Sequence, residues 1–339
     1  MPLPRRKPKE FTGRNQPRRE LALACKWLNL VELTDFRGKA WRRFYKLETL
    51  ASAVDKLVRD GDRFITPAFE QELGPGRLTQ VAFTLADEDA LRLIFHVKVA
   101  NANRKRASLM LVVAKNAEEA SRRIQLEFKH LKILADRLGD DMAVPIRLGT
   151  IFMPDRYRRA DQNREIAAYI TRHPNHCEPL GIHKSGQYMS LGAQPHTFSK
   201  RETEQLRHKM TSIIVKAYHP IERDGIDTHQ LDLSTFQVQR GSKSGPGLKL
   251  FNCVHMQTRL TPVKVLAFLL CDTWKSGGFE SPYVPSDPED FLDALTGVLG
   301  KDTALTWLGQ YVKLAKTGKA KAPDPEYLDA LAALCAPGA

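Results

Sequence analysis

The sequence predicts an α+β protein with a small β-rich first part and a larger helical second part. Three observations lead to this prediction. Apolar and polar residues alternate between residues 78 and 114, as they do in strands with one buried face. Residues 117–138 instead repeat apolar residues at helical spacing. Helix-start signals then mark the C-terminal part, such as Thr261 before Pro262 and the pair Ser286 and Glu289.

Composition and charge fit a globular chain with an anionic partner. Of the 339 residues, 42% are hydrophobic, enough for the core of one large two-lobed domain or of two ordinary domains. The chain carries 52 Lys and Arg against 39 Asp and Glu, a formal net charge of +13. This excess favours an anionic ligand: a nucleotide, a phosphorylated sugar, an anionic lipid surface or nucleic acid. The charge does not choose among them, and a solvated basic surface has the same composition.

Cysteine usage and hydropathy favour a cytoplasmic protein. The five cysteines are scattered and form no C-x-x-C pair, so a secreted disulfide framework is not indicated. The longest apolar run, residues 263–271, is interrupted by Lys264 and is far shorter than the roughly 20 residues of a membrane-spanning helix. We therefore expect a protein without a transmembrane segment, either free in the cytoplasm or peripheral to the inner face of the membrane.

The N-terminal part divides into an arm and a helical extension. Residues 1–19 combine Arg, Lys and Pro with very few apolar residues, so we predict a flexible basic arm, either a tether to anionic lipid or nucleic acid or an inert end. Residues 20–62 are predicted to form an N-terminal extension of two helices, 20–33 and 39–60. The apolar stripe of the second helix packs on the protein body or lies on a membrane surface.

The rest of the chain is predicted to form two lobes. Residues 63–172 make a β-rich N-lobe with one helix, and its expected elements are strands 78–85, 91–99 and 108–114, helix 117–138 and strands 146–153 and 165–171. Residues 173–339 make a helical C-lobe. It begins in a loop or hinge, 172–199, and its expected elements are helix 202–219, strands 236–239 and 248–251, and helices 262–274, 288–299, 302–315 and 325–335.

The N-lobe holds candidates for binding phosphate. Phosphoryl transfer needs backbone donors over the phosphates, a cation that holds them, a positioning carboxylate and oxygen ligands for magnesium. Gly74-Pro75-Gly76 stands before a predicted strand, where glycines would let the backbone approach phosphate, although a plain turn has the same composition. Lys98 and Lys115, each on a predicted strand, both qualify as the cation, and Glu127 on the following helix would hold either of them.

At this point the order of elements and the motifs resemble protein-kinase-like phosphotransferases, among them lipopolysaccharide core sugar kinases and aminoglycoside phosphotransferases. The resemblance implies a two-lobed protein-kinase-like fold that binds ATP and Mg²⁺ in the cleft between its lobes. Gly74 and Gly76 would then cover the phosphates. The catalytic loop would carry His229 and Asp232. The Mg²⁺ ligands would be Asn252 and Gln237, or Thr235 in place of Gln237.

The chain departs from the pattern of that family at three positions. Asp232 follows His229 one position late, Gln237 or Thr235 replaces an asparagine, and Asn252 replaces an aspartate, which removes a negative charge from the metal site. Two functions follow from the resemblance: ATP-dependent phosphoryl transfer to a hydroxyl of a small molecule or glycolipid sugar, or a non-catalytic pseudokinase scaffold. A basic nucleic-acid-binding protein is the alternative from outside this family, without a helix-turn-helix or zinc-finger pattern to support it.

Overall fold

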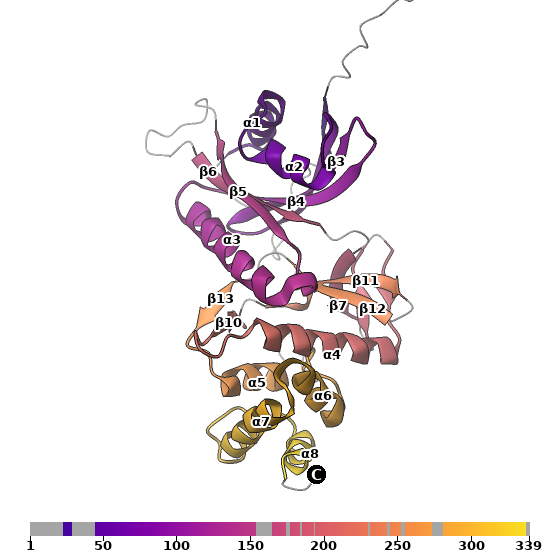
Figure 1. Ribbon diagram of the computed structural model, residues 1–339, viewed down its shortest axis with the longest axis vertical. Coiled ribbons are helices and arrows are strands. Elements are labelled where there is room, and N and C mark those ends of the chain that lie inside the picture. Colours follow the sequence, from indigo (N-terminus) through magenta and orange to yellow (C-terminus); the bar gives the residue numbers. More distant parts are fainter. Residues whose placement is uncertain are drawn as a thin grey trace, which may run out of the picture.

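The predicted fold class is confirmed: the chain is an α+β protein with a β-rich first lobe and a larger second lobe dominated by helices (Figure 1). The computed structural model describes residues 23–28, 45–153, 165–173, 177–183, 185–192, 194–229, 231–242, 245–251, 255–272 and 281–336. The predicted basic arm, residues 1–19, lies outside these residues. The order of strands, one long helix, two strands and then a helical lobe agrees with the order predicted from the sequence.

The first lobe is built on a six-stranded sheet with the order β1-β2-β3-β4-β6-β5. Its strands are β1 (Ala24–Leu28), β2 (Leu78–Glu88), β3 (Arg92–Asn101), β4 (Arg106–Ala114), β5 (Pro145–Phe152) and β6 (Glu165–Arg172). The pairs are antiparallel except β1 with β2, which is parallel. The five strands from β2 to β6 agree with the alternating pattern of the sequence.

Helices cover both faces of this sheet. On one face, Trp27 stacks on Phe83 with ring centroids 4.3 Å apart and donates a hydrogen bond of 2.9 Å to Asp55 on α1 (Leu47–Asp60). The short helix α2 (Ile65–Leu73) packs against β3, β4 and β5. Residues of β3 alternate between the faces, so Arg92 lies on the face opposite Phe95. That face carries α3 (Glu119–Leu138), whose Glu127 contacts Arg92.

Two local predictions for the first lobe were wrong. Within the predicted helix 20–33, Ala24–Leu28 is a strand, because Cys25 and Trp27 turn toward the protein while Lys26 faces solvent, and Trp27 packs on Phe83. The helix α2 was not predicted, since nine residues are too few for a clear helical repeat. It begins where the Asp62 carboxylate accepts hydrogen bonds from three backbone N–H groups, those of Phe64, Ile65 and Thr66.

The second lobe begins with a five-stranded sheet, of which the sequence predicted two strands, 236–239 and 248–251. The predicted loop 172–199 contains β7 (Cys177–Ile182), β8 (Tyr188–Ser190) and β9 (His196–Thr197). They join β11 (Phe236–Ser242) and β12 (Gly245–Leu250) in the order β12-β11-β7-β8-β9. The strands β7, β8 and β9 are too short for a clear alternating repeat, so pairing of β7 with β11 and β8, and of β8 with β9, determines their conformation rather than local propensity.

Helices form the rest of the second lobe. Its elements are α4 (Lys200–Ala217), β10 (Asp224–Ile226), β13 (Met256–Thr258), α5 (Pro262–Cys271), α6 (Pro288–Leu299), α7 (Lys301–Lys316) and α8 (Pro325–Leu334). Helix α6 starts at Asp287, whose carboxylate accepts from Glu289 N, and not at the predicted Ser286 cap, because Ser286 bonds Glu204. No helix among the described residues is long and apolar enough to cross a membrane.

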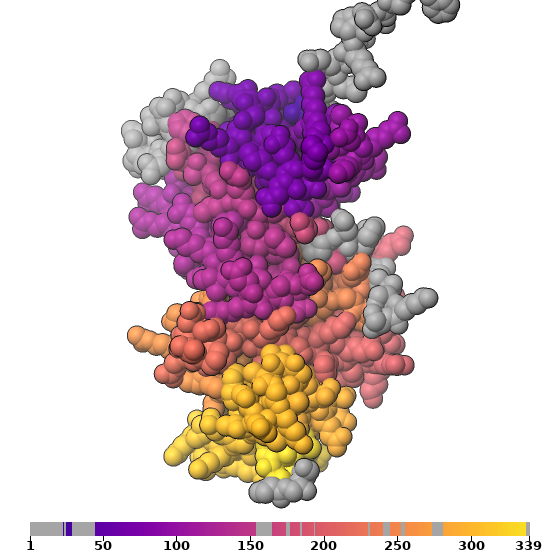
Figure 2. All heavy atoms as spheres, viewed as in Figure 1, coloured from indigo at the N-terminus to yellow at the C-terminus, as the bar shows by residue number. Residues whose placement is uncertain are grey.

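The C-terminal end of α3 joins the two lobes. Arg137 donates to Asp224 and to Glu222, both at 2.8 Å, and Lys216 of α4 donates to Leu138 O and to Asp141, both at 2.9 Å. Figure 2 shows the same order on the surface, with the first lobe, α3, α4 and the C-terminal helices following one another along the long axis. The helix that carries Glu127 is therefore anchored in both lobes.

Candidate functional site

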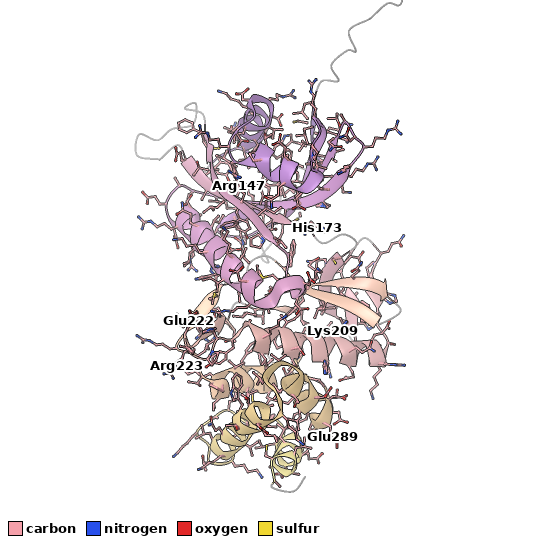
Figure 3. The ribbon with its side chains drawn as sticks, in the orientation of Figure 1. Arg147, His173, Lys209, Glu222, Arg223 and Glu289 are labelled. Atoms are coloured by element: carbon pink, nitrogen blue, oxygen red, sulfur yellow. The ribbon has the colours of Figure 1, made fainter. Side chains whose placement is uncertain are left out.

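A hollow of about 820 Å³ opens on the first sheet beside His173, whose ring meets Phe251 of the second lobe. We call it the interlobe pocket, and its lining residues are Gln80, His96, Lys98, Val99, Ala100, Arg106, Ala107, Ser108 and His173. All belong to β2, β3 and β4 or to the residue that follows β6. Figure 3 shows His173 between the first sheet and the strands of the second lobe.

The strand register explains which side chains line this pocket. Lys98 pairs with Ser108 across β3 and β4, and Ala100 pairs with Arg106. Because alternate residues of a strand share a face, His96, Lys98 and Ala100 lie on one face together with Ser108 and Arg106. This is the face that also carries α3. The apolar residues between them point to the other face, into the core under α2.

Flat rings form one wall of the interlobe pocket. The rings of His96 and His173 lie with centroids 4.6 Å apart, and His173 meets Phe251 of the second lobe edge-on at 5.6 Å. His96 Nε2 and Ser108 Oγ share a hydrogen bond of 2.5 Å, and His173 N donates to Ser108 O at 3.0 Å. Burial, followed by the charge of Lys98, lowers the pKa of His96. This wall is therefore aromatic, and burial favours the neutral form of His96.

Of the two candidate lysines, only Lys98 lines the pocket. Its side chain is exposed there, together with that of Arg106. Lys115 lies beyond the far end of β4 and is fully buried, with Nζ 2.8 Å from Oε1 of the buried Glu88. The sequence left the choice between Lys98 and Lys115 open. The positions of their side chains favour Lys98 as the residue that can meet a ligand.

Glu127 is held by an arginine in place of the expected lysine. Arg92 Nη1 lies 2.5 Å from Glu127 Oε2, and the Tyr169 hydroxyl donates to Glu127 Oε1 at 2.6 Å. His255 Nε2 is 3.7 Å from the same carboxylate. The sequence pattern did not single out Arg92 or Tyr169, because each is brought to α3 by sheet pairing from a distant part of the chain.

His255 of the second lobe and His130 of α3 extend this network. His255 O accepts from Asp227 N at 2.7 Å, and His130 Nδ1 on α3 accepts from Met256 N at 3.1 Å. Burial is the largest influence on both imidazoles and lowers the pKa of each, with a smaller opposing effect of Glu127. The network therefore joins α3 to the segment that enters β13.

Gly74 and Gly76 form a turn between α2 and β2. Gly74 (φ +67°) ends the helix, and its N–H donates to Glu70 O at 2.8 Å. A Cβ on Gly76 (φ +144°) would lie 2.9 Å from the amide nitrogens of Asn101 and Asn103. The loop thus packs against the β3–β4 turn, where Asn103 Nδ2 donates to Pro75 O at 2.9 Å. These contacts account for both glycines by turn geometry and close packing.

The predicted catalytic loop is held by local hydrogen bonds. Asp232 begins a 3₁₀ turn, Leu233–Thr235, by accepting from Thr235 N at 3.2 Å and Ser234 Oγ at 2.5 Å. His229 is exposed, and its N–H donates to Asp227 Oδ1 at 3.0 Å. Neither Asp232 nor His229 lines the interlobe pocket.

Of the predicted magnesium ligands, the structure describes Gln237 and its alternative Thr235 but not Asn252. Gln237 is buried in β11, and Asn252 lies outside the described residues. Thr235, the alternative to Gln237, is buried and donates to Asp232. Across the part of the chain that the structure describes, no three His, Cys, Asp or Glu side chains gather in a way that could hold a metal ion.

Comparisons with known proteins do not identify a function for this chain. No family model matches the chain, and no curated protein matches it. Among solved structures, the chain is similar to the amicoumacin kinase hAmiN in complex with AMP-PNP, Ca²⁺ and Ami. The identity is 11%, the match covers 86% of this chain and 95% of that chain, and the TM-score is 0.37. Values this low assign neither a ligand nor an activity to the present protein.

Proposed function

We propose that the protein binds a nucleotide, with ATP as the expected ligand, in the interlobe pocket. The observation that carries this proposal is the joint lining of one pocket by cations and by planar imidazole rings. Lys98 and Arg106 supply positive charge, and the rings of His96 and His173, tilted by 40° with centroids 4.6 Å apart, supply planar surfaces. A nucleotide offers the complementary pair, phosphates and a planar base.

The place of the pocket supports the same ligand. It lies on the α3 face of the first sheet and reaches the residue that follows β6, where the chain passes to the second lobe. The resemblance of the sequence to protein-kinase-like phosphotransferases implies that ATP binds between the lobes. The pocket volume of about 820 Å³ is within the range of about 300–1,000 Å³ that small-molecule sites occupy.

For the chemistry, we favour binding without efficient phosphoryl transfer. A transfer reaction needs a carboxylate that positions the acceptor hydroxyl and oxygen ligands that hold magnesium near the phosphates. The carboxylate of Asp232 is used to cap a 3₁₀ turn. The predicted ligand Asn252 lies outside the described residues, so we derive no step through the metal. The alternative is an active enzyme that transfers the phosphoryl group to a hydroxyl of a small molecule or glycolipid sugar. In that case Asp232 would position the acceptor hydroxyl.

Calorimetric titration with ATP tests the binding proposal. We expect saturable binding to the wild type and a loss of about tenfold or more in affinity for Lys98→Ala, since one of two pocket cations is removed. Lys56→Ala is the matched control, because Lys56 is exposed on α1, over the other face of the sheet. Absence of binding to the wild type at millimolar ATP, or equal losses in both variants, contradicts the proposal.

A turnover assay separates the two forms of the proposal. The wild type and Asp232→Asn are incubated with Mg²⁺, ATP and a panel of sugars and glycolipids, and ADP release is followed. We expect no acceptor-dependent ADP release from either protein. Acceptor-dependent release by the wild type that Asp232→Asn abolishes, with ATP affinity unchanged, establishes phosphoryl transfer instead.

A further inference from the structure

Two neighbouring hollows lie along α4 in the second lobe, and Lys209 lines both of them. The first, of about 700 Å³, is formed by residues 200–209 of α4 and the start of α6. The second, of about 250 Å³, is formed by residues 209–213 of α4, residues 247–249 of β12 and two further residues, 141 and 239. We call the two hollows together the α4 groove. It shares no lining residue with the interlobe pocket.

One backbone position of β12 is open toward this groove. Strand β12 is at the end of the second sheet, so its outer side has no neighbouring strand among the described elements. On that side Leu250 O accepts from Ala143 N at 2.9 Å, and Pro246 O accepts from Lys209 Nζ at 2.7 Å. The N–H and C=O of Leu248, midway between them, point to the same side, because alternate residues of a strand share an edge. Within the described chain neither group has a hydrogen-bond partner. A strand placed beside β12 can bond both.

Four cations line the α4 groove. Lys200 and Arg201 are exposed at one end, and Lys249 of β12 is half-buried at the other. None of these three pairs with a carboxylate in the part of the chain that the structure describes. Lys209 lies between them, on α4 below the strands of the second sheet, and donates to Pro246 O (Figure 3). The carbonyl has no net charge, so the charge of Lys209 is not neutralised by this bond.

Two of the three described carboxylates that line the groove are already bonded. Glu204 accepts from Ser286 N at 2.8 Å and from Ser286 Oγ at 2.9 Å. Asp141 pairs with Lys216 at 2.9 Å. The third carboxylate, that of Asp290, is exposed. The groove therefore presents an excess of positive charge, and a ligand with several negative charges complements it.

The spacing along α4 fits an extended chain. Arg201, Gln205 and Lys209 follow one another four positions apart, so they lie about 6 Å apart along one face of the helix. Alternate residues of an extended peptide lie about 7 Å apart on one face. A peptide that runs along α4 therefore places successive side chains of one face over these three residues, whereas a single small anion meets only one of the two cations.

The lining favours a peptide over a strand of nucleic acid. Single-stranded nucleic acids bind proteins through stacking on aromatic side chains as well as through charge. No described lining residue of either hollow is Phe, Tyr or Trp. Asp290 would repel a backbone that is charged at every phosphate, but it can pair with a basic residue of a peptide. The open N–H and C=O of Leu248 also match a peptide backbone.

We propose that the α4 groove docks an extended acidic segment of a partner protein. The segment pairs its backbone with Leu248 at the edge of β12. Its acidic side chains contact Arg201, Lys209 and Lys249. Because the groove and the interlobe pocket share no lining residue, this inference does not depend on the proposed nucleotide binding.

Selection of peptides by the full-length protein tests the docking site. A random heptapeptide library displayed on phage is selected against the wild type, and fluorescent copies of the enriched peptides are titrated by anisotropy. We expect enriched peptides with Asp or Glu at alternate positions. Arg201→Glu and Lys249→Glu should each weaken binding about fivefold or more without lowering the melting temperature. The control Lys313→Glu reverses an exposed cation of α7 and should bind like the wild type.

A scan of single N-methyl groups along the best peptide tests the backbone pairing. Each N-methyl group removes one N–H donor. We expect a loss of about tenfold in affinity at the position that donates to Leu248 O, and little change at its two neighbours, whose N–H groups point to the other edge.

The opposite results overturn the proposal. Failure to enrich any peptide, enrichment of neutral or basic peptides, or equal affinity of the wild type and both groove variants contradicts an acidic docking segment. Equal tolerance of N-methyl groups at every position contradicts the pairing with Leu248. A ten-nucleotide oligothymidylate that displaces the peptide and binds more tightly than it does makes nucleic acid the occupant instead.

Discussion

Arg92 Nη1 lies 2.5 Å from Oε2 of Glu127, so an arginine of β3 and a glutamate of α3 form the ion pair that fastens the helix to the first sheet. The Tyr169 hydroxyl donates a hydrogen bond to the other carboxylate oxygen, Oε1. Glu127 is buried, and the side chain of Arg92 is 17% exposed. A lysine of the sheet was expected in this place, and the arginine reaches it from the start of β3, at the end remote from the interlobe pocket.

Replacing Glu127 by Gln should destabilise the fold and spare nucleotide binding. The change leaves the Arg92 guanidinium partly buried with a weaker partner, and loss of one member of such a pair costs about 3 kcal/mol in the free energy of unfolding. Urea unfolding measures this cost. The control is Asp136→Asn, which removes the negative charge of an exposed side chain on the same helix. It should change the free energy of unfolding by less than about 0.5 kcal/mol. If Glu127→Gln is as stable as the control, the ion pair between Arg92 and Glu127 does not stabilise the fold.

The buried pair of Lys115 and Glu88 should behave as a structural unit. Lys115→Met leaves Glu88 charged and buried, at a cost of about 3 kcal/mol, whereas adding Glu88→Leu removes the unpaired charge and should recover most of that loss. Chemical unfolding of the two single variants and the double variant gives the coupling energy. A double variant as unstable as the sum of the two single variants argues against a direct pair. ATP affinity of the folded Lys115→Met protein should equal that of the wild type.

Stability should fall as the pH decreases through the histidine range. The pKa values of His96, His130 and His255 all lie below the ordinary 6.5 because the imidazoles are buried. Their neutral forms are favoured by folding, so the stability that they contribute is present above about pH 6.5 and is lost as the pH falls below it. His130→Asn keeps an acceptor for Met256 N but does not titrate. Its melting temperature should therefore change less between pH 7 and pH 5 than that of the wild type, and an identical pH profile disproves the assignment.

Trp27 should anchor β1 to the sheet. Trp27→Ala removes the stacking on Phe83 and the hydrogen bond to Asp55, and we expect a loss of about 2–3 kcal/mol, less than for a fully buried tryptophan. Lys26→Ala, one residue earlier on the exposed side of the strand, should be nearly neutral. Thermal unfolding compares the two. Similar losses in both variants are not compatible with a strand in this register.

The sequence was sufficient for elements whose apolar repeat is long. The strands from residue 78 to residue 114 and the helix that contains Glu127 have repeats of that kind, and the structure confirms them. It was not sufficient for β1 and β7, because strands of five and six residues are specified by their pairing partners. The sequence around a residue also does not show which side chain from a distant part of the chain contacts it.

This limit applies to the candidate site as well. Lys98 could be selected from its strand, but Arg92 is 35 residues from Glu127 and comes to it only through the pairing of β3 with β4, the strand that precedes α3. The contribution of His173 depends on where β6 ends, and that of Phe251 depends on how the second lobe meets the first. For Gly74 and Gly76 the sequence suggested a function, phosphate binding. In the structure, packing against the β3–β4 turn is sufficient to explain these glycines.

The measurement that tests the central claim most directly is amide hydrogen exchange with and without ATP. The account predicts slower exchange in peptides that cover Val97–Ser108 and the segment around His173, where the ligand contacts the pocket walls, and little change in α7 and α8. Protection confined to the second lobe, or no protection at a concentration that saturates binding, would contradict a nucleotide site in the interlobe pocket.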